Sequence, residues 1–108
     1  MNSSIREHIK DMVAQLPHEP GVYQFLDRSG KIIYVGKAKD LRKRVSSYFV
    51  ENRDHSAKVI VLVRQVVDIR HIVVGSEQDA LLLENSLIKS LQPRYNILLK
   101  DDKTYPWI

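Results

Sequence analysis

The sequence predicts a small α+β domain in which a three-stranded, mostly antiparallel sheet is flanked by helices. Two runs rich in β-branched and aromatic residues, 21–26 and 31–36, are joined by the short polar segment 27–30, which is the pattern of a β-hairpin. A third such run, 67–74, predicts the third strand. Apolar residues recur at helical spacing before the hairpin and after the third run. One domain over residues 1–108 is expected.

The composition is that of a globular protein that favours polyanions. Hydrophobic residues make up 44% of the chain and there is no cysteine, which excludes disulfides and thiolate metal sites. The sequence has no long apolar run and no apolar signal segment at its start, so we expect no membrane partner and a cytoplasmic location. The net charge of +4 is a mild bias toward ligands such as DNA.

The first helix is expected to open with a capping box formed by Ser4 and Glu7. Its apolar residues repeat at helical spacing as far as Leu16. Pro17 and Pro20 then end the helix and begin an extended stretch.

The segment between the hairpin and the third strand holds one clear helix and one ambiguous element. Asp40 can cap a helix over Leu41–Phe49, and residues 51–56 read as a polar loop. The run V-I-V-L-V within 58–66 suits a strand and a buried helix equally well.

The longest helix is expected over 76–91, with Ser76 and Asp79 at its start and Pro93 beyond its end. Residues 94–108 are polar and aromatic without a clear period, so no regular element is predicted there. The chain ends on Y-P-W-I without a turn or a polar cap. We therefore expect the domain to be the amino-terminal piece of a longer protein.

The hairpin carries two mirrored triplets, Gly21-Val22-Tyr23 and Tyr34-Val35-Gly36. A two- or four-residue turn, with Gly30 supplying an unusual dihedral angle, places Tyr23 directly opposite Tyr34 on one face. Tyrosines in strands commonly do no more than pack. The pair can therefore belong to the core or to a reactive site.

Basic residues concentrate directly after the second triplet, in K-A-K-D-L-R-K-R. Lys39, Arg42 and Lys43 suit a solvated helix face. Arg44 lies at the edge of the apolar stripe, one turn before Tyr48, where a guanidinium can hold a phosphate in bidentate geometry. The segment is thus a candidate phosphate-binding surface beside the tyrosines.

Glu84 falls in the middle of the apolar face of the longest helix. That face is formed by Ala80, Leu83, Leu87, Ile88 and Leu91. A carboxylate there needs a compensating charge. It can form an ion pair with Arg44 or a lysine, or it can bind Mg²⁺, which often needs only one or two carboxylates. The four histidines are scattered and predict no zinc site.

The two triplets, followed by G-K-A-K-D-L-R-K-R-V-S-S-Y-F, L-L-L-E-N-S-L-I-K and P-R-Y-N-I-L-L-K-D-D-K-T-Y-P-W-I, resemble the GIY-YIG nuclease domain. Among such domains, the residues and the order of these segments are similar to the amino-terminal domain of the bacterial UvrC excinuclease family. The resemblance covers nearly the whole chain from about Leu16 onward. Each triplet differs from the family name only by valine in place of isoleucine.

The resemblance implies that one divalent metal and a water molecule cut a phosphodiester. Tyr34 would be the general base and Tyr23 would orient the water or tune the base. Arg44 would hold the scissile phosphate, and Glu84 would bind Mg²⁺, with Mn²⁺ able to substitute. Lys37, Arg44 and the metal are expected to favour the phenolate of Tyr34.

Further residues match supporting positions of the family. Lys37 would act with the base, while Tyr48 and Asn96 would support the phosphate and the local hydrogen bonds. Lys39 and Arg42 are expected to contact DNA phosphates.

By the same resemblance, the domain would make the incision on the 3′ side of a lesion in bacterial nucleotide excision repair. Damaged double-stranded DNA would be delivered by UvrB, with UvrA acting upstream. Two alternatives stay open from the sequence: a catalytically silent DNA-binding module, and a stand-alone GIY-YIG nuclease with another specificity. Sequence-dependent cutting of undamaged DNA would indicate the latter.

Overall fold

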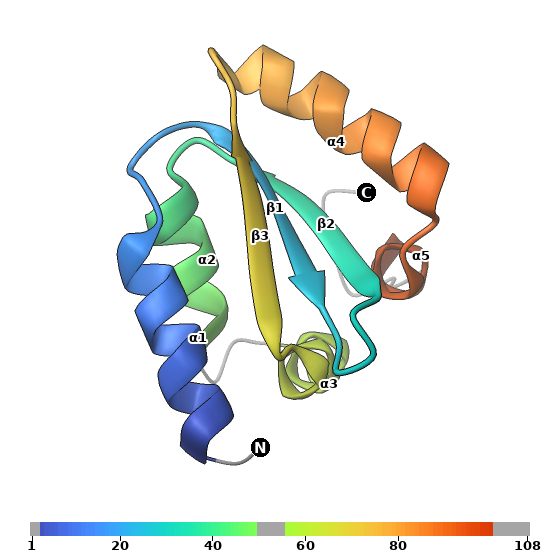
Figure 1. Cartoon of the computed structure of the whole chain (residues 1–108). Coiled ribbons are helices and arrows are strands. Elements are labelled where there is room, and N and C mark those ends of the chain that lie inside the picture. The colour runs from blue at the N-terminus through green and yellow to red at the C-terminus, as the bar shows by residue number, and fades with distance from the viewer. Residues whose placement is uncertain (1–2, 50–55, 101–108) are drawn as a thin grey trace.

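The computed structural model describes residues 3–49 and 56–100. Its elements follow one another in the order α1 (Ser3–Gln15), β1 (Gly21–Leu26), β2 (Ile32–Ala38), α2 (Leu41–Phe49), α3 (Ala57–Gln65), β3 (Asp68–Val73), α4 (Glu77–Leu91) and α5 (Arg94–Lys100) (Figure 1).

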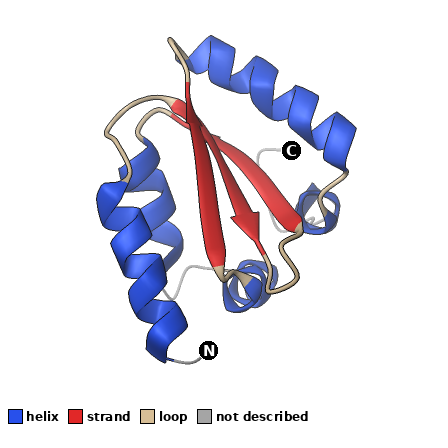
Figure 2. Ribbon diagram, viewed as in Figure 1, coloured by secondary structure: helices blue, strands red, loops and turns tan. Residues whose placement is uncertain are grey.

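The predicted fold class is confirmed: a three-stranded sheet of order β2-β1-β3, antiparallel throughout, is flanked by helices. Helices α1 and α2 lie side by side on one side of the sheet and α4 lies on the other (Figures 1 and 2). The larger core cluster contains Tyr23, Phe25, Val45 and Leu62, and the smaller one, under α4, is built on Val22, Val35 and Ala80.

The turn between β1 and β2 differs from the even-numbered turn predicted. The N–H of Asp27 donates to the carbonyl of Lys31 (3.0 Å), so three residues form the loop. Gly30 has φ +83° at its end, and the Asp27 carboxylate accepts from the N–H groups of Ser29 and Lys31. This is the three-residue loop in which a glycine adopts the left-handed conformation.

A three-residue turn by itself would place Tyr34 on the opposite face of the sheet from Tyr23. A β-bulge in β2 shifts the register by one residue and brings Tyr34 back to the same face. Leu26 pairs with Ile32 but Phe25 pairs with Tyr34, so one extra residue is inserted in β2. Tyr34 therefore shares a face with Tyr23, as predicted. The prediction that the two residues lie directly opposite is wrong, because Tyr23 is opposite Gly36.

Two other segments differ from their predictions. The ambiguous run is the helix α3, capped by the Ser56 hydroxyl, which accepts from the Val59 N–H. The tail predicted to be irregular begins with α5, because Tyr95 anchors it in the core although the helix is too short to show an apolar period. Helix α1 is described from Ser3, and the Ser4 side chain of the predicted capping box, like residues 50–55 and 101–108, lies outside the described part. No helix between residues 3 and 49 or 56 and 100 combines the length and hydropathy needed to cross a bilayer.

The ring of Tyr23 lies over Gly36 in the middle of the hairpin. A Cβ atom at Gly36 would overlap Cζ and Oη of Tyr23. The Tyr23 side chain is 1% exposed, and its Oη is 2.8 Å from the Oη of Tyr48 on α2. Burial, followed by the neighbouring Tyr48 and Tyr34, raises the pKa of Tyr23 well above its ordinary value, while Arg44 opposes the rise.

Gly36→Ala should displace the Tyr23 ring and lower the free energy of unfolding by about 1–3 kcal/mol, as expected when a packed core is overfilled. Chemical denaturation followed by circular dichroism would measure the change. Gly75→Ala is the matched control, because the nearest atom to its Cβ would be Asp79 Oδ2 at 3.4 Å. Equal stabilities for the two variants would contradict the role given to Gly36.

The buried Tyr23 phenol should also make the domain sensitive to alkali. Its pKa is raised on folding, so its contribution is complete below the unfolded-state pKa of about 10 and is lost as pH rises further. The free energy of unfolding should fall by up to about 1.4 kcal/mol per pH unit for this group. Urea titrations at several alkaline pH values should show a shallower decline for Tyr23→Phe; identical slopes would refute the assignment.

Candidate active site

The candidate site lies along the outer edge of β2, the edge that does not pair with β1. There the N–H of Val35 donates to Asn96 Oδ1 (2.8 Å), and Asn96 Nδ2 donates to the carbonyl of Val35 (2.8 Å). The side chain of Asn96 thus replaces a neighbouring strand at this point. Its two hydrogen bonds fix α5 against the strand that carries Tyr34 and Lys37.

Tyr34 lies half-buried in a cluster of aromatic rings. Its ring centroid is 6.2 Å from that of Tyr23, 5.9 Å from Phe25 and 6.3 Å from Tyr48. Burial raises the pKa of Tyr34 above its ordinary value, and Tyr48 adds to the rise, whereas Arg44 lowers it. Arg44 thus favours the phenolate, as expected, but in the protein alone desolvation outweighs its charge.

Arg44 projects from α2 beside these rings. The neighbouring Leu41, Val45 and Tyr48 are buried and fix the helix against the sheet. The Cζ atom of Arg44 is 5.5 Å from the centre of the Tyr48 ring, a cation–π geometry. The residue is nevertheless exposed, so its guanidinium can bind an anionic ligand beside the tyrosine rings.

Glu84 approaches the same edge from α4. Burial raises the pKa of its carboxyl group above the ordinary value, while the ammonium and backbone N–H of Lys37, and then Arg44, lower it. None of the ion pairs between described residues includes Glu84. The predicted apolar face is less buried than its spacing indicates, since Leu91 at its end is 42% exposed. Glu84 is therefore a half-buried carboxylate whose burial Lys37 and Arg44 offset only in part.

This carboxylate fits one kind of metal site. Within the described ranges, no three His, Cys, Asp or Glu side chains gather into a ligand cluster, so a cage made wholly of protein ligands is not formed there. Mg²⁺ commonly uses one or two carboxylates and completes its octahedron with water and substrate phosphate. Glu84, a partly desolvated carboxylate near the charges of Lys37 and Arg44, suits that arrangement.

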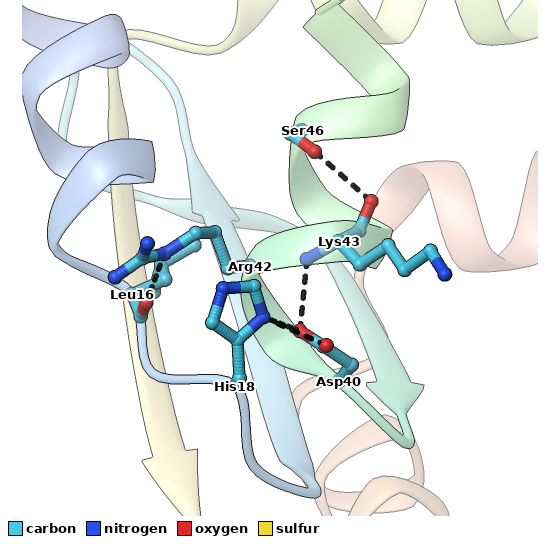
Figure 3. Close-up of polar contacts among 6 residues, drawn as sticks. All are labelled: Leu16, His18, Asp40, Arg42, Lys43 and Ser46. Carbon is cyan, nitrogen blue, oxygen red and sulfur yellow. Dashed lines mark hydrogen bonds and ion pairs between the residues drawn. The ribbon is translucent and has the colours of Figure 1, made fainter.

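Two basic residues expected to contact DNA phosphates are engaged elsewhere. The Nε of Arg42 donates to the carbonyl of Leu16 (2.7 Å), and Figure 3 shows the side chain turned toward the end of α1. Lys39 Nζ is 3.6 Å from Glu77 Oε1, an exposed pair of little energetic weight. Arg42 thus joins α2 to the end of α1, and Lys39 forms an exposed ion pair with the first residue of α4.

Sequence reasoning missed one side-chain contact at the start of α2, between His18 and Asp40. The Nδ1 atom of His18 is 2.8 Å and 3.0 Å from the two carboxylate oxygens of Asp40 (Figure 3). Asp40 caps α2 as predicted, accepting from the Lys43 N–H. The two residues are 22 positions apart in the chain, so no local pattern could have paired them.

A family model described as the UvrC-like GIY-YIG domain matches residues 19–97. UvrABC system protein C of Flavobacterium psychrophilum is 68% identical over 96 residues, covering 89% of this chain and 16% of the relative. The protein of the same name from Bacteroides thetaiotaomicron is 61% identical over 103 residues, covering 94% of this chain and 17% of the relative. The chain spans about a sixth of the length of the curated relatives it matches.

Solved structures agree with this assignment. The GIY-YIG N-terminal endonuclease domain of UvrC from Thermotoga maritima, bound to its catalytic divalent cation magnesium, is 38% identical. The match covers 88% of this chain and 98% of that domain, with a TM-score of 0.70. Variants of that domain with a tyrosine changed to phenylalanine, or an asparagine to alanine, were also solved with the cation bound. The family model, the relatives and the fold agree, and the chain belongs to the family of UvrC-like GIY-YIG domains.

Proposed function

We propose that this chain is a metal-dependent endonuclease domain that hydrolyses one phosphodiester bond of DNA. The observation that carries the proposal is that Arg44 and Tyr34 both lie against the Tyr48 ring, with Glu84 near enough to raise the pKa of Tyr34. The three side chains come from β2, α2 and α4, yet their charges act on one another: Arg44 and Glu84 both shift the pKa of Tyr34. A phenol, a guanidinium and a carboxylate are the parts needed to handle a water proton, a phosphate and a cation.

Glu84 is the proposed cation ligand, and the magnesium-bound domain from T. maritima supports Mg²⁺ as the ion, with Mn²⁺ able to substitute. When bound, Mg²⁺ would supply Lewis-acid stabilisation of phosphate charge and a more acidic water. DNA phosphate and water would complete the coordination, since the described part of the chain offers one carboxylate here.

Arg44 would act on the phosphate of the substrate and Tyr34 on the attacking water. The guanidinium of Arg44 would bind non-bridging phosphate oxygens and stabilise the charge that develops as water attacks phosphorus and the P–O bond breaks. Tyr34 would orient that water through Oη. It can accept the water proton there only after losing its own, and Arg44 is the described cation that lowers its pKa.

The neighbouring residues hold these groups in place. The hydrogen bond between Tyr23 and Tyr48 positions the ring against which Tyr34 packs. Asn96 fixes the strand at Val35, and Lys37 counters the charge of Glu84. Such support matters because phosphoryl transfer depends chiefly on positioning and electrostatic stabilisation.

The name of the relatives, UvrABC system protein C, supports a proposal for the biological setting. We propose that the domain, as the amino-terminal part of a longer protein, makes the 3′ incision of nucleotide excision repair in the cytoplasm. UvrB on damaged DNA, loaded with the help of UvrA, would present the substrate.

The decisive test uses the full-length protein that carries this domain, an end-labelled duplex with one lesion, the partner repair proteins and Mg²⁺. Glu84→Ala and Tyr34→Phe should each reduce the 3′ cut by at least about 100-fold, because each removes a group that acts on the transition state. Complex assembly and folding should persist. A 3′ cut at the parent rate in both variants would instead indicate a DNA-binding module.

Glu84→Gln provides a test that does not depend on cleavage. Because burial raises the pKa of Glu84, its ionised form opposes folding at neutral pH, and neutral glutamine should raise the Tm in EDTA slightly, by about 2 °C. Millimolar Mg²⁺ should then raise the Tm of the parent but not of Glu84→Gln. Differential scanning calorimetry measures both effects. Equal Mg²⁺ shifts in the two proteins would place the cation elsewhere.

A further inference from the structure

The start of α2 is fastened to the segment that connects α1 to β1. The N–H of Leu41 donates to the carbonyl of Glu19 (3.0 Å), and the N–H of Arg42 donates to that of Pro17 (3.2 Å). Two side-chain contacts join the same partners: Arg42 Nε with the carbonyl of Leu16, and His18 with Asp40 (Figure 3). We call this set of contacts the latch. It consists of Leu16, Pro17, His18 and Glu19 on one side and Asp40, Leu41 and Arg42 on the other.

The latch joins a part of the chain outside the matched family model to a helix inside it. The family model begins at residue 19, after α1 and most of the connecting segment. Ile9 and Leu16 from this amino-terminal part are buried in the same cluster as Val45 and Tyr48 of α2. Helix α1 is therefore packed into the core, and the latch connects the end of α1 to the first turn of α2.

We propose that the latch positions α2 for catalysis, so that His18 and Arg42 are positioning residues for Arg44 and Tyr48. This inference rests on the proposed nuclease function. Arg44 lies two residues beyond Arg42, and its N–H donates to the carbonyl of the latch residue Asp40 (3.0 Å). A small rotation of the helix would move the long side chain of Arg44 by about an ångström, a displacement that can cost a large part of a catalytic rate.

The geometry of Arg42 separates positioning from phosphate binding. A positioning role needs an N–H donor at the ε position, whereas a phosphate-binding role needs positive charge. Glutamine carries an N–H donor on the same Cδ atom but no charge, and lysine keeps the charge but has no donor there. Comparing Arg42→Ala, Arg42→Gln and Arg42→Lys therefore distinguishes the two roles.

The experiment measures single-turnover 3′ nicking at saturating full-length protein, together with DNA affinity and Tm. Arg42→Ala should slow nicking about tenfold with little change in affinity. Arg42→Gln should recover most of the rate and Arg42→Lys should not. In the same way, His18→Asn, which can still donate a hydrogen bond to Asp40, should nick faster than His18→Ala. Lys43→Ala is the control, because its side chain extends away from the latch (Figure 3).

Each outcome has one meaning. Parent-like nicking by Arg42→Ala, or faster nicking by Arg42→Lys than by Arg42→Gln, would overturn the positioning role. If Arg42→Ala does not fold at the assay temperature, the comparison of the glutamine and lysine variants still decides. A failure of the proposed function is recognised separately, since the parent protein would then not nick, or Glu84→Ala would nick as the parent does.

Discussion

The contact between the Tyr23 ring and the backbone of Gly36 is the constraint on which the site depends. Any side chain at Gly36 would occupy the space of that ring. With the ring in place, the Tyr23 hydroxyl reaches Tyr48 and so joins the central strand to α2. The phenol of Tyr34 then packs against both rings. The glycine of one triplet and the tyrosine of the other are thus two halves of one packing contact.

In the site, burial and neighbouring positive charges shift the pKa values of the ionisable groups in opposite directions. Desolvation holds the proton on Tyr34 and raises the pKa of Glu84, while Arg44 and Lys37 only partly compensate. Without a ligand this arrangement is electrostatically unfavourable, which is common where binding and catalysis are prepared in advance. A cation and a phosphate would complete the set of charges that the protein leaves unbalanced.

Local patterns predicted the elements that have strong local causes, namely the hairpin, the capped helix α2 and the long helix α4. They also singled out Arg44 and Glu84, because a charge on or beside an apolar helix face is visible in sequence, whereas for Tyr34 they left core packing and a reactive site both open. The bulge in β2 was not predictable, since it follows from how the sheet twists and packs rather than from residue type. The orientation of Arg42 and the raised pKa of Tyr34 depend on tertiary packing, which periodicity does not contain.

The hydrogen bonds of Asn96 to Val35 also have a meaning for solubility. An exposed sheet edge is a template on which strands of other molecules can pair and aggregate. At the outer edge of β2, one amide side chain occupies both the donor and the acceptor of Val35, so another strand cannot pair with the edge there. Asn96 therefore acts as a local guard against self-association along the strand that carries Tyr34.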